Sequence, residues 1–143
     1  MRPPTEMASS LRPVMRPIRG WVRPRGPYSQ GVLAVGRHLY VAAQGPLDPA
    51  TGEIAGEAFA AQARRTLENV TAVLKAGGAS LVDVVRVTVY LADRKYLDEL
   101  NEIYGEYFPA PCPARTPIRI AVPLGLIMMD GIAVIAEPEG ETR

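Results

Sequence analysis

The apolar pattern of residues 59–91 constrains the fold of this chain most, because it changes from a helical period to a strand period. Between residues 59 and 74, apolar side chains recur at steps of three and four, which places them on one face of a helix. The pair Gly77 and Gly78 predicts the end of that helix. Between residues 85 and 91, valine and leucine alternate with polar or amphipathic residues, which predicts a strand with one buried face.

Further strand signals lie on both sides of this region. They are found at residues 32–35, 39–43, 116–122 and 126–136. The first two predict strands around a turn, and residues 48–53 are rich in turn formers. Asp93 can cap a second helix, which the prolines from Pro109 onward end. This order of elements predicts an α+β fold in which two helices cover one face of a mixed sheet.

The opposite face of such a sheet has no helix to cover it. Side chains expected there are Val41, Thr88, Tyr90 and Met128. If they point to that face, association of several copies is the simplest way to remove them from water. The pattern therefore predicts a ring-like homo-oligomer.

The chain of 143 residues has the length of one domain, but its N-terminal part differs in composition. The first 27 residues hold six arginines and one acid, a charge of about +5 within a total of +1. Six of the 14 prolines also lie there. We therefore predict an extended or disordered Pro/Arg-rich extension at residues 1–25, a folded domain at residues 26–138 and a C-terminal tail at residues 139–143.

Several classes of protein are excluded by composition. With 48% apolar residues, the chain is not expected to be disordered. One cysteine, Cys112, and one histidine, His38, cannot form a disulfide framework or a Cys/His zinc site within one chain. The apolar runs are too short for a membrane span, so we expect a soluble protein. The single cysteine fits a reducing compartment, so we expect a cytoplasmic location. Net charge and the sparse interleaving of basic and aromatic residues make nucleic acid an unlikely partner.

Arg115 is the first candidate site residue, because prolines hold it at the entry to a strand. A guanidinium presents a planar fork of N–H donors that matches a carboxylate, such as that of an α-keto, α-imino or α-amino acid. The alternative interpretation is a surface salt bridge to Glu102 or Glu106, which local spacing alone favours.

Two further candidates are less distinctive. Tyr28 follows a Gly-Pro turn and can form one wall of a pocket, although a half-buried strand tyrosine with a hydrated hydroxyl fits equally well. Asp130 lies within an otherwise apolar strand, so it either faces water at an edge or bulge, or lies in a pocket with a partner. Cys112 can be an accessible thiol, and His38 has no expected role beyond solubility.

Five segments, in this order, resemble the YjgF/RidA family of reactive-intermediate (Rid) deaminases. They are GPYSQG at residues 26–31, QGPLDPATGE at 44–53, QAR with LENV at 62–70, VTVYL at 87–91 and PAR at 113–115. The resemblance implies a chorismate-mutase-like fold and a homotrimer centred on a β-barrel, with clefts between subunits. It also implies that Arg115 binds the substrate carboxylate, and that Tyr28 and Ala43 line the cleft.

Members of the family with this arginine hydrolyse enamines and imines, such as 2-aminoacrylate and 2-iminobutanoate, to 2-oxo acids and ammonia. The resemblance therefore implies an imine deaminase that needs no cofactor and no metal. Family proteins are also often labelled ribonucleases, an interpretation that we rank low here.

This sequence departs from the family pattern at the position of a water-positioning glutamate, where it has Met128. A cleft serine is replaced by Ala42, and the glycine after it by Ala43. Asp130 lies on the same strand face as Met128 but about 7 Å farther along the strand. We consider it as a substitute for the missing glutamate, although its short side chain has to span that distance to the attacking water. Loss of a positioned general base lowers the rate of a reaction about 10²- to 10⁴-fold. The alternative is therefore a non-catalytic protein that binds or senses small 2-oxo acids.

Overall fold

The computed structural model of this chain describes residues 16–18 and 23–137. The predicted tail at residues 139–143 and most of the predicted extension at residues 1–25 lie outside the described residues. The described strands are β1 (Arg16–Pro17), β2 (Val32–Leu33), β3 (Arg37–Gln44), β4 (Val84–Leu91), β5 (Ala114–Arg119) and β6 (Ile127–Ile135). The helices are α2 (Phe59–Ala76) and α3 (Leu97–Tyr107), with short 3-10 turns η1 (Leu81–Asp83) and η2 (Arg94–Tyr96).

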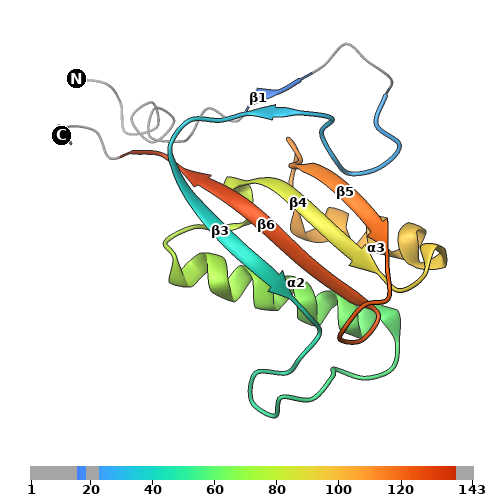
Figure 1. Cartoon of the computed structure of the whole chain (residues 1–143). Helices are drawn as coiled ribbons and strands as arrows, with labels where there is room; N and C mark the ends of the chain where they lie inside the picture. The colour runs from blue at the N-terminus through green and yellow to red at the C-terminus, as the bar shows by residue number, and fades with distance from the viewer. Residues whose placement is uncertain (1–15, 19–22, 138–143) are drawn as a thin grey trace, which may run out of the picture.

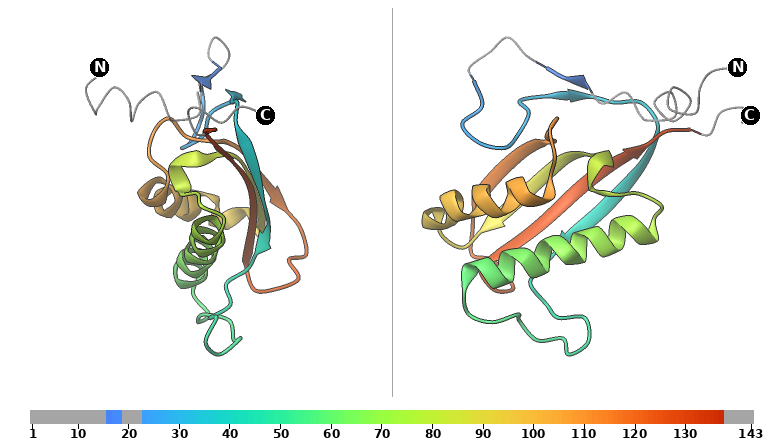
Figure 2. Two further views of the ribbon diagram at one scale, coloured as in Figure 1. Left: turned by 90° about the vertical axis from the view of Figure 1, so that its left-hand side faces the viewer. Right: turned by 180° about the vertical axis from the view of Figure 1, so that it is seen from behind.

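The main sheet has the strand order β3-β6-β4-β5. Strand β6 is antiparallel to both of its neighbours, whereas β5 runs parallel to β4, so the sheet is mixed (Figure 1). Helices α2 and α3 both lie on one side of it, and no helix of the described residues covers the other side (Figure 2, left view). The predicted α+β architecture is confirmed. Among the helices described, none is long and apolar enough to cross a membrane.

The core lies between the helices and the sheet, and the predicted periods account for it. Helix α2 buries the predicted stripe of Phe59, Ala63, Leu67, Val70 and Leu74. Strand β4 buries every second residue near its end, Val87, Val89 and Leu91, against these side chains. Burial of such apolar side chains is the main favourable term in folding.

One expectation about the uncovered face was wrong. Val41 is only 4% exposed and belongs to the core, while its neighbours Tyr40 and Ala42 face outward. The run of apolar residues in this strand hid the phase of the alternation, because either set could face the core. The partly exposed residues Thr88 and Tyr90 do alternate with the buried residues of β4.

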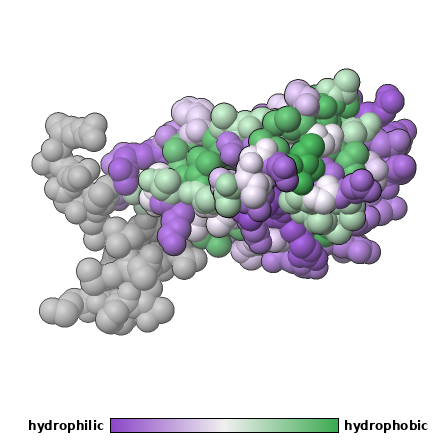
Figure 3. Space-filling model, turned by 90° about the horizontal axis from the view of Figure 1, so that it is seen from below, coloured by the Kyte–Doolittle hydropathy of each residue, from purple (hydrophilic) through white to green (hydrophobic). Residues whose placement is uncertain are grey.

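We call the uncovered side of the main sheet the open sheet face, and define it by Tyr40, Thr88, Tyr90, Ile118 and Met128. Tyr40 is 71% exposed and Ile118 is 40% exposed. Figure 3 shows the molecule from below the view of Figure 1. On that side, apolar residues form small groups among hydrophilic ones, which is normal for a protein surface.

The N-terminal strands differ from expectation in their pairing. Both strands predicted around the turn at residue 36 are present, but β2 pairs with β1, whereas β3 pairs with β6. Gly36 has a φ of +153°, and a Cβ there would lie 2.2 Å from the Ile135 carbonyl oxygen. The chain therefore turns closely past β6 and enters the main sheet instead of folding back on β2.

Two polar residues of α2 hold the neighbouring loops. The Gln62 amide donates to the Gly56 carbonyl oxygen at 3.0 Å, and its Oε1 accepts from the Leu126 N–H at 2.8 Å. The Asn69 amide donates to two carbonyl oxygens of the segment 45–47, at 2.9 and 2.8 Å. These side chains explain in physical terms why polar residues stand beside the buried stripe of α2.

We expect Gln62→Met to lower the free energy of unfolding by about 2–4 kcal/mol, because a buried N–H and a carbonyl group lose their partners. Urea denaturation measures the change. Gln44→Met is the matched control, since the Gln44 amide makes an exposed bond to the Ala42 carbonyl oxygen at 3.0 Å. Its expected cost is below about 1 kcal/mol. Equal losses in the two variants would contradict the assigned role of Gln62.

Candidate functional site

Arg115 lies on the side of the sheet that faces the helices. Its register partner on β4 is Val87, a core residue, and side chains at paired positions share a sheet face. The Arg115 Cζ atom lies 4.9 Å from the centroid of the Tyr104 ring on α3 and 5.3 Å from that of Tyr28. The guanidinium therefore lies close to two aromatic rings, an arrangement that favours a cation.

The alternative of a surface salt bridge is contradicted by the structure. Arg115 is 8% exposed and takes part in none of the ion pairs found within residues 16–18 and 23–137. Glu106 pairs instead with Arg64 of α2, at 2.7 Å. That ion pair lowers the pKa of the Glu106 carboxyl and removes it as a partner for Arg115.

Two nitrogens of the Arg115 side chain, Nε and Nη1, are buried and have no acceptor among residues 16–18 and 23–137. Burial lowers the pKa of the guanidinium, while Tyr104, Tyr28 and Cys112 partly restore it. Arginine nevertheless keeps its charge in proteins. A buried, charged group without acceptors is costly, so this arrangement is suited to accept an anion.

Helix α3 adds two polar residues that the sequence reasoning missed. The Asn101 Oδ1 atom and the Tyr104 hydroxyl are both buried, and neither has a hydrogen-bond partner in the part of the chain that the structure describes. A Cβ at Gly26 would lie 3.1 Å from Arg115 Nη2 and 3.3 Å from Asn101 Nδ2, so both side chains border this glycine. The available signal was an asparagine one helical turn before a tyrosine, beside the apolar stripe of the helix.

Tyr28, whose ring lies close to the Arg115 guanidinium, belongs to the segment before β2. The Ser29 N–H donates to the Pro113 carbonyl oxygen at 3.0 Å, and its hydroxyl donates to the Cys112 carbonyl oxygen. The loop that carries Tyr28 is thereby tied to the segment before Arg115. Tyr28 is half-buried, and its hydroxyl oxygen accepts the Arg25 N–H at 3.3 Å.

Cys112 is half-buried next to this site. Burial raises the pKa of its thiol, and the nearby Arg115 lowers it only in part. At neutral pH the side chain is therefore a thiol, which is a poor nucleophile compared with a thiolate.

Burial also raises the pKa of the Tyr104 phenol above its ordinary value of about 10. The pKa of the Tyr104 phenol is higher in the folded protein than in the unfolded chain. Its contribution to the free energy of unfolding is therefore complete below pH 10, and it is lost as pH rises through the folded-state pKa. We expect one of the six tyrosines to ionise only together with unfolding, in an alkaline titration followed by tyrosinate absorbance and circular dichroism. Tyr104→Phe should remove this late phase, and a late phase that persists would contradict the assignment.

The other predicted site residues lie on the open sheet face. Met128 and Asp130 alternate with the core residues Ile127 and Met129 of β6, so they point away from the helices. Ala42 and Ala43 are exposed on β3, at the irregularity between Val41 and Gln44. Within one chain, the sheet therefore separates this group from Arg115 and Tyr28.

Asp130 has partners on this face. Its carboxylate accepts the Tyr90 hydroxyl at 2.7 Å and the Thr88 N–H at 3.3 Å. The bond to Asp130 raises the pKa of Tyr90. The structure gives Asp130 a partner, Tyr90, on a strand inside the sheet and not at its edge. The partner is not a group beside Arg115, and a pocket around Asp130 stays a prediction.

A mixed sheet with two helices on one face and a buried arginine in its edge strand place this chain in a class of small α+β domains. Residues 21–135 match the family model described as Endoribonuclease L-PSP. The chain therefore belongs to this family, which is the YjgF/RidA family that its motifs resemble.

Individual comparisons agree with this assignment. A RutC family protein of Pyrococcus abyssi is 46% identical over 113 residues, which are 78% of this chain and 88% of that protein. The human 2-iminobutanoate/2-iminopropanoate deaminase is 41% identical over 96 residues, 67% of this chain and 69% of that enzyme. The crystal structure of E. coli TdcF with bound serine is similar at a TM-score of 0.65 and 33% identity, covering 79% of this chain and 91% of that one.

Proposed function

We propose that this protein hydrolyses reactive enamines and 2-imino acids, of the 2-aminoacrylate and 2-iminobutanoate type, to 2-oxo acids and ammonia. The observation that carries the proposal is the buried Arg115 guanidinium, close to two tyrosine rings, whose Nε and Nη1 atoms lack an acceptor within the described residues. The carboxylate common to these substrates supplies the missing acceptors. The name of the human relative and the serine bound to TdcF support the same class of ligand.

The active site in this proposal is a cleft between subunits of a homotrimer. Arg115, Tyr28 and Asn101 lie on one side of the sheet, and Ala43 and Met128 lie on the other. A single chain does not bring the two groups together, so a second copy has to supply one of them. The exposed apolar residues of the open sheet face support association of this kind, because contact between copies would bury them.

The reaction needs few catalytic groups from the protein. The carbon of a protonated imine is electrophilic, so water adds to it, and the resulting carbinolamine expels ammonia to leave the 2-oxo acid. Arg115 orients the substrate by its carboxylate, and Asn101 and Tyr104 offer hydrogen bonds nearby. Met128 cannot take the proton of the attacking water, and the Asp130 carboxylate is already bonded to Tyr90 and Thr88. We therefore expect slow turnover.

The second candidate is a non-catalytic protein that binds or senses 2-oxo acids at the same site. Met128 and Ala42 favour it, because they remove the polar groups of the family pattern from one half of the cleft. RNA binding ranks below both functions. Three arginines of the surface, Arg37, Arg64 and Arg65, are each paired with a glutamate, which reduces the positive charge available to phosphates.

The direct experiment is an imine-trapping assay. A serine dehydratase releases the enamine, semicarbazide traps the imine, and a deaminase lowers the yield of semicarbazone. Calorimetric titration with 2-oxobutanoate, pyruvate and benzoate is run in parallel. A lower semicarbazone yield supports the deaminase, and binding heat without such a decrease supports the sensor. If neither is observed, both functions are wrong.

A further inference from the structure

The segment that carries Tyr28 lies between the two strands of the small sheet. We call residues 23–30 the Tyr28 loop; β1 precedes this loop in the chain and β2 follows it. The two strands pair in the antiparallel direction, and the Ile18 N–H donates to the Gly31 carbonyl oxygen at 2.8 Å. Figure 1 shows them side by side above the main sheet. The Tyr28 loop is therefore closed at its base.

The sequence of β1 suits this pairing. Hydrogen-bonded and non-hydrogen-bonded pairs alternate along two antiparallel strands. Because Ile18 and Gly31 are hydrogen-bonded, Pro17 and its partner Val32 form a non-hydrogen-bonded pair, in which a proline lacks no bond. A Cβ at Gly31 would lie 3.2 Å from Ile18 Cγ1. The Ile18 side chain therefore packs closely on the backbone of Gly31 and holds the base of the loop.

The Tyr28 loop is also attached to the edge strand of the main sheet. The Ser29 N–H donates to the Pro113 carbonyl oxygen at 3.0 Å, just before β5. At Gly26 the loop passes so close to the site that an added Cβ would lie 3.1 Å from Arg115 Nη2. Tyr28 stands between these two points in the chain. Its position beside Arg115 therefore depends on how both sides of the loop are held.

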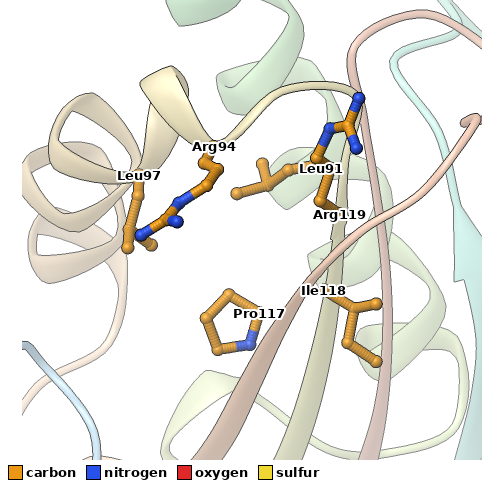
Figure 4. A pocket seen from close by; sticks show the side chains of 6 residues that line it. All are labelled: Leu91, Arg94, Leu97, Pro117, Ile118 and Arg119. Carbon is orange, nitrogen blue, oxygen red and sulfur yellow. The ribbon is translucent and has the colours of Figure 1, made fainter.

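The site continues along β5 in the direction away from the Tyr28 loop. A pocket of about 240 Å³ lies there, between β5 and the start of α3 (Figure 4). Pro117, which lines it, lies on the same strand face as Arg115, and Leu97 precedes Asn101 by one turn of α3. The pocket is therefore part of the site described above, and the Tyr28 loop borders the opposite end of that site.

We propose that β1 acts as a clasp that keeps Tyr28 beside Arg115, with Ile18 as the positioning residue. Pairing at both ends restricts the conformations of a loop. Without β1, the Tyr28 loop would be held only from the side of Ser29, so Tyr28 would be in place for part of the time. The apparent Kd of a ligand rises in proportion to the lost fraction. This effect on binding rests on the proposed function, whereas the clasp itself does not.

The first test measures binding of 2-oxobutanoate to the full chain by calorimetry. Ile18→Ala removes the packing on Gly31, and Gly31→Ala pushes against Ile18 from the other side. We expect each variant to raise the Kd about fivefold, as for a loop in place about one fifth of the time. Ile18 is half-buried and lies outside the core cluster, so both variants are expected to fold.

Two matched variants and a kinetic readout accompany this test. Ile18→Val keeps a branched side chain on Gly31 and should keep the affinity. Leu33→Ala changes a residue of β2 that is 52% exposed and should also leave binding unchanged. In the imine-trapping assay, Ile18→Ala should raise KM by the same factor as Kd without changing kcat, since only the competent population falls. A loss in Leu33→Ala as large as that in Ile18→Ala overturns the proposal.

A double-mutant cycle shows whether Ile18 acts through Tyr28. Tyr28→Ala by itself should weaken binding, and Ile18→Ala should cause no further loss in that background. A residue with a merely structural role would weaken binding equally in both backgrounds. Additive losses of affinity therefore overturn the proposal.

Hydrogen exchange tests the clasp without a ligand. In Ile18→Ala, the Ser29 N–H should exchange at least about fivefold faster, while the amides of the core strand β4 keep their rates. Unchanged exchange at Ser29, or equal acceleration in β4, overturns the proposal. If Ser29 alone exchanges faster but the original protein does not bind 2-oxobutanoate, the clasp is supported and the proposed function is the part that is wrong.

Discussion

Replacing Arg115 by methionine is expected to weaken the binding of 2-oxobutanoate about 100-fold, measured by calorimetry. Methionine keeps an unbranched apolar chain between the rings of Tyr28 and Tyr104 but removes both the charge and the donors. A carboxylate in the cleft would then lose its charged, two-point partner. In the imine-trapping assay, the same variant should lose any decrease in semicarbazone yield.

The stability of this variant separates a binding defect from unfolding. Methionine removes two buried N–H groups that have no acceptor, which offsets the loss of stacking against the two rings. We therefore expect the free energy of unfolding to stay within about 1 kcal/mol of the original value or to rise. Arg115→Lys keeps the charge but not the planar fork, so intermediate binding is expected. Unchanged affinity in Arg115→Met would falsify the assignment of the carboxylate site.

Met128→Glu is expected to raise kcat for imine hydrolysis about 100-fold. The substitution introduces a carboxylate on the open sheet face, where it can accept a proton from the attacking water. Because Arg115 still holds the substrate, KM should change little. The nearby Asp130 carboxylate also raises the pKa of a new glutamate toward neutrality, which suits a general base.

Met128→Gln is the matched control for this gain. Its side chain has the size and hydrogen-bonding capacity of glutamate but cannot take up the proton. We expect kcat to remain near that of the original protein. If glutamine raises kcat as much as glutamate does, the effect is one of polarity, and the general-base explanation is wrong.

Most of the fold could be predicted because it follows from local periods. The stripe of α2 is buried as predicted, and so is the alternation of β4 from Val87 to Leu91. Val85 is only partly buried, because the register shifts between Val84 and Arg86. The error at Val41 arose where an apolar run left the phase undetermined. The pairing of β2 with β1 was also beyond a local pattern, because it depends on which segments meet after the turn at Gly36.

The candidate site was predictable only in part. Arg115 and Tyr28 stood out because prolines and glycines fix the chain beside them. Asn101 and Tyr104 did not, because their unpaired polar atoms become evident only when α3 packs over β5. The local spacing of Glu106 suggested a partner for Arg115, yet the fold placed that carboxylate against Arg64 instead.

The sequence by itself determined which segments form helices and strands, and which of their faces are apolar. Both are local properties, since they depend on side-chain identity at a fixed spacing. The tertiary structure alone decided that Arg115 is buried with no counter-charge from the described residues, and that the sheet separates it from Met128 and Asp130. These properties depend on contacts between residues far apart in the chain, and no local pattern records whether a distant acid is near enough to pair.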